Sequence, residues 1–184
     1  MIIIQSHFME SFQNDLKKAL QKITSLFKSK KIKFSIIGGA ALTQYGNIRL
    51  TQDIDILVDK SSKEKLLSIS RVELKPKFQG TEKSFILQDP KTEIDIIYTG
   101  DKTQSKDKKF SFYYDKIYSN TIDDVPYTDI KHFLYYKIGV GRTQDIADVE
   151  SVIKHNDLSI EYMNEFDIYI KEKYKEIWND IKGE

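Results

Sequence analysis

Residues 53–58 alternate polar and apolar side chains, and this period of two constrains the fold more than any other feature of the chain. The alternation predicts a β-strand with one buried face. Asp53 and Asp55 therefore share one face of the strand, and Ile54 and Ile56 share the other. Two adjacent carboxylates repel each other, and a shared Mg²⁺ would relieve that repulsion. The alternative is an exposed edge strand with solvated aspartates.

A glycine pair, Gly38 and Gly39, follows the apolar run 34–37 and precedes residues that favour a helix. The pattern predicts a strand, a tight turn and the start of a helix. Without a Cβ atom, the glycines let the backbone turn sharply and let a ligand approach the main chain. The free N–H groups that open the helix attract anions. We therefore expect a phosphate chain to bind at this turn.

A second alternating segment, 92–98, carries Glu93 and Asp95 on the face opposite Ile94 and Ile96. If this strand pairs beside 53–58, Asp95 completes a triad of carboxylates with Asp53 and Asp55. Such a triad can hold two metal ions and help to deprotonate an attacking hydroxyl. Glu93 shares the face and is an alternative third acid. A surface residue on a half-solvated strand is the other interpretation of Asp95.

Lys137 lies on the core-facing stripe of a helix predicted over 129–139. An inward ammonium is costly unless an anion meets it, and the candidates are Asp148, another acid or a bound phosphate. The purely structural alternatives are a buried Lys137–Asp148 ion pair between two helices and a lysine that extends to solvent near Gly139. Gly139 and Gly141 are expected to break this helix.

The next helix is expected to begin near Thr143 as its N-cap and to place Asp145 and Asp148 on one flank. The helix dipole explains Asp145 sufficiently. Asp148 is the better candidate for orienting Lys137. Arg49, just before the acid pair, either contacts a phosphate or forms a salt bridge.

The remaining elements are predicted from periodicity and turn residues. We expect helices at 8–30, packed on the sheet, at 62–70 and at 160–181, and strands at 73–78 and 84–88. A loop at 99–109 precedes the aromatic stretch 110–114, for which a place in the core is favoured over stacking on a single-stranded nucleic acid. The apolar side chains of the terminal helix are expected to pack within the chain rather than at a dimer or partner interface.

With 184 residues, 40% hydrophobic and 31% charged, the chain is expected to form one domain around one core. Its net charge of +1 gives no global case for nucleic-acid binding. Cysteine is absent and the three histidines are scattered, so any metal is expected to have oxygen ligands. The opening residues do not form a signal peptide and no apolar run reaches membrane-spanning length, which favours a cytoplasmic protein without a membrane partner.

These motifs together resemble the polymerase-beta-like nucleotidyltransferases, and more finely the AbiEii-type branch of abortive-infection and toxin-antitoxin transferases. The resemblance covers about residues 32 to 155 and rests on four segments: 36–41, Tyr45-Gly46, 49–55 and 136–150. It implies an α+β fold, with a mixed β-sheet flanked by helices. The expected organisation is an N-terminal helix at 1–31, a nucleotidyltransferase sheet core at 32–126 and C-terminal helices at 127–184.

The resemblance implies transfer of a nucleoside monophosphate from an NTP to an acceptor hydroxyl, with two Mg²⁺ ions, or Mn²⁺, as cofactors. It also implies tRNA or another RNA as the acceptor, and an antitoxin or a second copy of the chain as the expected protein partner. The alternatives are a catalytically weak antitoxin or partner-binding module and a small-molecule (antibiotic) nucleotidyltransferase. By position, the metal-binding acids are Asp53, Asp55 and Asp95, which are catalytic together with Lys137; the nucleotide-binding residues are Gly38, Gly39, Arg49, Lys137 and Asp148. Gly39 stands where many members have a serine that contacts the triphosphate.

Overall fold

A seven-stranded mixed sheet forms the centre of the computed structural model, which describes residues 2–46, 51, 53–69 and 71–183, with side chains from Asn14 onward. The strand order is β3-β4-β5-β2-β1-β9-β8. These strands are β1 (Phe34–Ile36), β2 (Asp53–Val58), β3 (Leu74–Pro76), β4 (Ser84–Gln88), β5 (Lys91–Tyr98), β8 (Ser119–Ile122) and β9 (Val125–Thr128). β2 runs parallel to β5 and β1 runs parallel to β9, whereas the other neighbours are antiparallel. The predicted mixed sheet is confirmed.

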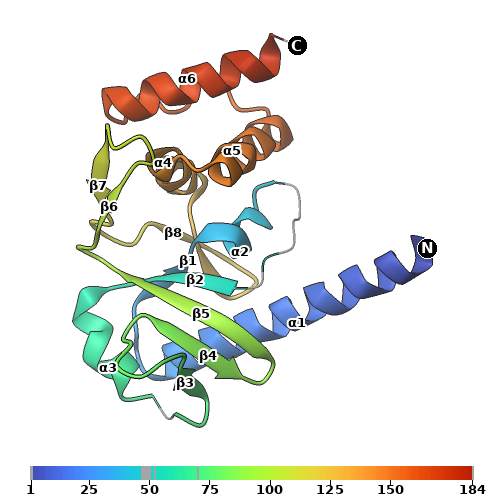
Figure 1. The fold of residues 1–184 in the computed structure, drawn as a ribbon, viewed down its shortest axis with the longest axis vertical. Helices are drawn as coiled ribbons and strands as arrows, with labels where there is room; N and C mark the ends of the chain where they lie inside the picture. The colour runs from blue at the N-terminus through green and yellow to red at the C-terminus, as the bar shows by residue number, and fades with distance from the viewer. Residues whose placement is uncertain (1, 47–50, 52, 70, 184) are drawn as a thin grey trace.

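Helices lie on both sides of this sheet (Figure 1). The long helix α1 (Ile2–Ser29) packs against β5 and β9, as predicted. On the other side, α2 (Gly38–Leu42) contacts β2, and α4 (Ile130–Val140), α5 (Thr143–Asn156) and α6 (Ile168–Lys182) stack on one another. The short helices η1 (Lys60–Ser62) and α3 (Lys63–Leu67) follow β2. The predicted strands at 73–78 and 84–88 correspond to β3 and β4.

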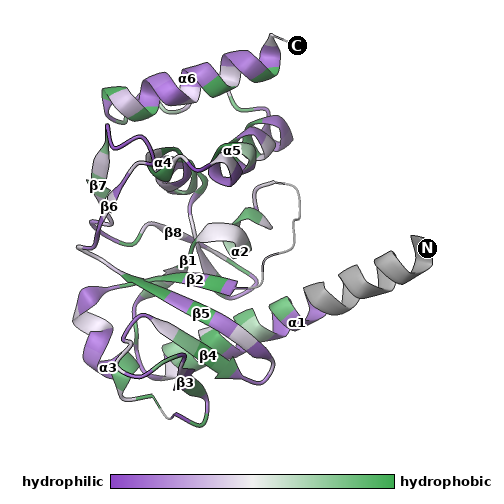
Figure 2. Cartoon of the chain, viewed as in Figure 1, coloured by the Kyte–Doolittle hydropathy of each residue, from purple (hydrophilic) through white to green (hydrophobic). Residues whose placement is uncertain are grey.

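The alternation of β2 is the reason that the sheet has an apolar face toward α1. Ile54 and Ile56 are fully buried and belong to the same core cluster as Ile23 and Phe27 of α1. Figure 2 shows hydrophobic residues concentrated in the central strands and a largely hydrophilic outer surface on α6. The four-residue spacing of Phe8, Phe12, Leu16, Leu20, Ile23 and Phe27 predicts an apolar stripe on α1. Its members from Leu16 onward lie in or against this core, and Phe8 and Phe12 lie outside the described side chains.

The terminal helix is shorter than predicted, because residues 160–166 form turns and α6 begins at Ile168. Asp167 caps it by accepting hydrogen bonds from the N–H groups of Tyr169 and Ile170. Tyr174 is fully buried, and the Trp178 indole donates to the Leu158 carbonyl at 2.8 Å. These contacts accord with the expected packing within the chain.

Two predictions about the α4–α5 connection are wrong. Gly139 lies inside α4, and only Gly141, with φ 70°, ends the helix in the left-handed conformation. Thr143 is the first residue of α5, and Arg142 occupies the N-cap position. Asp145, at the third position of the helix, accepts a hydrogen bond from the Arg142 N–H, which is the contact that the acidic residue of a capping box makes.

The segment predicted as a loop at 99–109 contains a strand, β6 (Lys102–Gln104), which pairs with β7 (Ser111–Tyr113). Phe112 of β7 is buried against α4, where a Cβ atom on Gly139 would lie 2.6 Å from its ring. Tyr113, in contrast, is 56% exposed. The aromatic stretch therefore contributes mainly to the core, as favoured. Among the described residues, no helix combines the length and apolar content that crossing a bilayer requires.

Candidate active site

The parallel pairing of β2 with β5 brings the predicted carboxylates together. Asp55 lies opposite Asp95, and Asp53 lies opposite Glu93. Carboxylate oxygens of Asp53, Asp55 and Asp95 all lie within 4.8 Å of one another, close enough to share a metal ion. The predicted pairing of the two strands is therefore confirmed.

Hydrogen bonds distinguish the two candidate third acids. Ser84 of β4 donates its hydroxyl to Asp95 at 2.7 Å, and Thr51 donates to Asp53 at 2.8 Å. Glu93 accepts from Lys77 and lies outside the cluster. Ser84 and Thr51 thus fix the orientation of two acids. The sequence carried no signal for either contact. Ser84 lies on a different segment from Asp95, and Thr51 lies outside the alternating pattern that contains Asp53.

Gly38 lies directly against Asp55. Its φ of +63° is in the left-handed region, and a Cβ atom at this position would be 1.9 Å from Asp55 Oδ2. Glycine is therefore required at this position for two reasons: the backbone is left-handed, and the Asp55 carboxylate leaves no room for a Cβ atom. The predicted glycine turn positions the acid as well as opening α2.

The pKa of Asp55 is raised from 3.8 to about 6, chiefly by burial and then by the charge of Asp53, with Asp95 adding to the effect. Lys137 and Arg142 oppose this shift. Partly buried carboxylates that repel one another and offer several oxygen ligands fit a divalent cation, which stabilises their ionised forms.

Lys137 is 7% exposed and forms ion pairs with Asp145 at 3.0 Å and Asp148 at 2.7 Å. The expected contact with Asp148 is present. Arg142, whose side chain is exposed, also donates from its Nε to the Asp145 carboxylate at 2.7 Å. Burial alone would raise the pKa of Asp145, but the Arg142 hydrogen bond and Lys137 hold it below its ordinary value. The helix-dipole explanation of Asp145 is therefore insufficient, since this residue is 1% exposed and joins both cations.

These two charge clusters share one cavity of about 400 Å³. Gly38, Gly39, the three aspartates, Lys137 and Arg142 line it, together with Thr51, Gln144 and Asp145. Asp145 and Asp148 match the charges of Lys137 and Arg142, and among the described residues no salt bridge reaches the three acids of the triad. The structure brings together the predicted site residues except Arg49, which lies outside the described residues, and Asp148, which contacts the cavity through Lys137.

No protein-family model matches the chain, and no curated protein matches it. Its fold is similar to the crystal structure of an antigenic nucleotidyltransferase-like protein from Paracoccidioides brasiliensis, with a TM-score of 0.61 and 15% sequence identity. The similarity covers 92% of this chain and 90% of the other. The chain thus has a nucleotidyltransferase fold of the α+β class, with an acidic triad at which a metal ion could bind.

Gly38→Ala is expected to destabilise the protein by about 3 kcal/mol, because left-handed backbone costs alanine roughly 1–2 kcal/mol and the clash with Asp55 adds a comparable amount. Gly80→Ala is the matched control, since Gly80 has φ +79° and no atom within 4 Å of an added Cβ. It should show the backbone cost alone. Urea denaturation of both variants measures the difference, and equal losses would contradict the Asp55 contact.

Asp55→Asn is expected to stabilise the metal-free protein near pH 8 and to stabilise it only about half as much near pH 5. The pKa of Asp55 is raised from 3.8 to about 6 in the folded protein, so between these pH values the folded protein binds more protons at Asp55 than the unfolded chain does. Wild-type stability is therefore lost as the pH rises from about 4 to 6. The gain near pH 8 should be on the order of 3 kcal/mol, measured by urea denaturation in EDTA. A gain of equal size at both pH values would argue against the charge effect.

Asp145→Asn should lower the free energy of unfolding by about 2–3 kcal/mol, because it leaves a buried lysine with one carboxylate fewer. Asp15→Asn provides a comparison at the exposed Lys18–Asp15 pair, which spans 3.9 Å. That change should cost less than about 0.5 kcal/mol. Chemical denaturation of both variants at neutral pH gives the two values; similar values would show that the buried pair contributes no more than a surface one.

Proposed function

We propose that this protein is a metal-dependent nucleotidyltransferase that moves a nucleoside monophosphate from an NTP to an acceptor hydroxyl. The proposal rests chiefly on the cluster of Asp53, Asp55 and Asp95, with ligand oxygens within 4.8 Å, on a nucleotidyltransferase fold. Carboxylates in this arrangement suit phosphoryl chemistry, which depends on positioning and on neutralising negative charge.

In this proposal Asp53, Asp55 and Asp95 would together hold two Mg²⁺ ions, or Mn²⁺ in their place. The ions would supply positive charge to the phosphates and lower the pKa of the attacking hydroxyl. Ser84 and Thr51 fix the carboxylates of Asp95 and Asp53 through their hydrogen bonds. Preorganised ligands lose little freedom when the cations and substrate arrive.

The triphosphate would lie along the shared cavity, between the Gly38–Gly39 turn and the cations of α4 and α5. Lys137 would steady it, with Asp148 holding the ammonium in place at 2.7 Å. Arg142 is exposed and lines the same cavity, so it can also face a phosphate. Arg49 is proposed to assist from the segment before β2. Because the lysine already has two carboxylate partners, the metal ions must supply most of the charge that holds the phosphates.

The resemblance to the AbiEii-type branch favours an RNA acceptor, tRNA in particular, for a single-domain cytoplasmic toxin with an antitoxin or homodimer partner. A small-molecule hydroxyl, as in antibiotic-modifying enzymes, is the alternative acceptor. A partner-binding module with weak catalysis is the second candidate function. The observation that favours it is the paired state of Lys137, together with Gly39, which offers only its backbone to a triphosphate.

Incubation with each labelled NTP, Mg²⁺ and total RNA is expected to transfer label to RNA. Asp53→Ala combined with Asp55→Ala should lower the transfer more than about 100-fold, since the site loses the charge that holds its cations. Asp95→Ala should do the same. Glu93→Ala is the matched control, because Glu93 shares the strand face but lies outside the cluster, and it should retain transfer.

Transfer that persists in the double variant would refute the catalytic assignment. If the wild-type protein labels no acceptor, calorimetry with the four NTPs in Mg²⁺ separates the two functions. Binding without transfer to RNA would direct the search toward a small-molecule acceptor. Absence of Mg²⁺-dependent binding to any NTP would favour the partner-binding module.

A further inference from the structure

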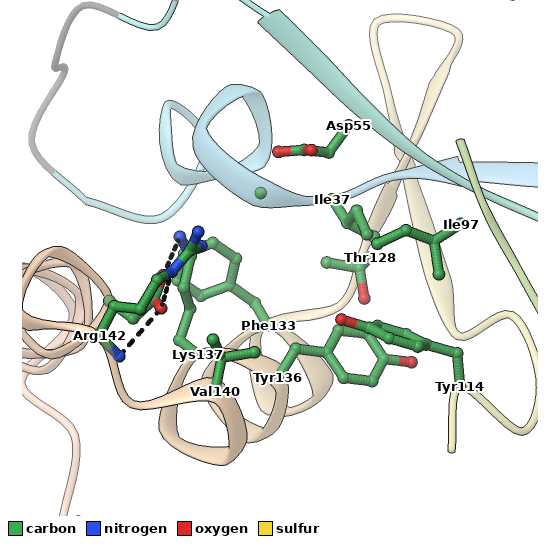
Figure 3. Close-up of a pocket in the computed structure, with 12 residues that line it drawn as sticks. Ile37, Asp55, Ile97, Tyr114, Thr128, Phe133, Tyr136, Lys137, Val140 and Arg142 are labelled. Carbon is green, nitrogen blue, oxygen red and sulfur yellow. Dashed lines mark hydrogen bonds and ion pairs between the residues drawn. The ribbon is translucent and has the colours of Figure 1, made fainter. Parts of the chain in front are cut away.

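A second, smaller cavity of about 80 Å³ opens beside the acidic cluster. Figure 3 shows its two ends. Arg142 and Lys137 lie at one end, near Asp55, and we call this the charged end. Thr128, Tyr114 and Tyr136 gather at the other, which we call the hydroxyl end. The cavity therefore leads from the proposed phosphate site into a region lined by rings and hydroxyl groups.

Two hydroxyl groups at the hydroxyl end have no hydrogen-bond partner among the described residues: Thr128 Oγ1 and the phenol oxygen of Tyr136. Thr128 is 1% exposed and Tyr136 is 6% exposed. A buried polar group without a partner is costly, so such groups are rare unless a ligand or water meets them. Both residues line the cavity, which makes its contents the available partner.

Aromatic rings line both ends of the cavity. The rings of Tyr114 and Tyr136 pack at the hydroxyl end with centroids 4.7 Å apart, and Phe133 lies at the charged end, where the Lys137 ammonium is 5.7 Å from the centre of its ring (Figure 3). Burial raises the pKa of both tyrosines, that of Tyr114 to about 12, so both phenols stay neutral. A neutral hydroxyl can donate and accept. The hydroxyl end can therefore pair with a hydrogen-bond donor or with an acceptor on the edge of a flat ring.

The small cavity adjoins the site of the acidic triad, since Gly38, Asp55, Lys137, Arg142 and Asp145 line both spaces. A molecule whose phosphates lie at the triad could thus place a flat group at the hydroxyl end. Size limits that group: a cavity of about 150 Å³ accepts benzene, so about 80 Å³ encloses only part of one ring, and two fused rings would leave more of their surface outside it.

We propose that the hydroxyl end binds the base of the NTP and prefers a single-ring pyrimidine, with Thr128 and Tyr136 donating to or accepting from its polar edge. This inference rests on the proposed nucleotidyltransferase function and adds the class of nucleotide. The aromatic side chains would stack on the base. A base whose polar edge does not reach the buried hydroxyls would leave them unpaired and would therefore bind more weakly. Cytosine and uracil both satisfy hydroxyls that can donate and accept.

Calorimetry in excess Mg²⁺ with inorganic tripolyphosphate, CTP, UTP, ATP and GTP separates the two proposals. Tripolyphosphate tests the metal and phosphate site alone. CTP or UTP is expected to bind at least tenfold more tightly than ATP or GTP. If tripolyphosphate and all four nucleotides bind equally, or purine nucleotides bind more tightly, the base preference is wrong and the proposed function stands. If none binds, the proposed function fails.

Thr128→Val and Tyr136→Phe remove the two hydroxyls and keep the side-chain shapes. Each should weaken binding of the preferred nucleotide about 5- to 10-fold and leave tripolyphosphate binding unchanged, as expected for one lost hydrogen bond. Each should also raise the Tm of the unliganded protein, because an unpaired buried hydroxyl is removed. Thr24→Val is the matched control: Thr24 Oγ1 of α1 is equally unpartnered among the described residues, at 3% exposure, but lies outside the cavity.

The control should raise the Tm and leave nucleotide binding unchanged. A lower Tm in Thr128→Val and Tyr136→Phe, with nucleotide affinity unchanged, would show that the hydroxyls serve the fold and would overturn the proposal. Weaker binding of tripolyphosphate and nucleotide alike would place the effect at the phosphate site and would also count against it.

Discussion

The parallel pairing of β2 with β5 is the constraint on which the rest of the site depends. The register that sets Asp55 opposite Asp95 also sets Ile54 opposite Ile94 and Ile56 opposite Ile96 on the other face. Burial of each isoleucine contributes about 1.5–3 kcal/mol. Burial, together with the charges of Asp53 and Asp95, raises the pKa of Asp55 from 3.8 to about 6, which corresponds to a cost on the order of 3 kcal/mol. Burial of the apolar face outweighs this cost and keeps the carboxylates together.

The charges of the site divide into two groups with different consequences. Lys137, Arg142, Asp145 and Asp148 form a balanced network that joins α4 to α5. Among the described residues, no salt bridge neutralises Asp53, Asp55 or Asp95, and Asp55 keeps a raised pKa even with two cations nearby. A site of this kind attracts cations first and phosphates only with them. That order is what a metal-dependent enzyme acting on a nucleotide needs.

The small cavity gives the same site a second kind of surface. Its charged end shares Gly38, Asp55 and Lys137 with the acidic cluster, while its hydroxyl end contains two unpaired buried groups. Unpaired groups lower stability, and proteins retain such local costs mostly at functional sites. The left-handed Gly38 against Asp55 fits the same pattern, because the backbone there adopts a conformation that suits the acid rather than an ordinary side chain.

Local sequence determined the faces of the strands. Alternation predicted that Asp53 and Asp55 share one face of their strand and that Glu93 and Asp95 share one face of theirs. The apolar stripe of α4 predicted that Lys137 points inward. All of this is confirmed. The glycine pair predicted the turn before α2. Periodicity suffices for these features because the direction of a side chain depends on its own backbone.

The tertiary structure decided which of those side chains meet. Only the pairing of β4 with β5 shows that Ser84 reaches Asp95, and only the packing of α5 on α4 shows that Asp145 joins Lys137. The unpaired hydroxyls of Thr128 and Tyr136 emerge in the same way, from β9 and α4. Residues far apart in the chain become partners through register and packing, and a single sequence contains the direction of each side chain but not its neighbour across the fold.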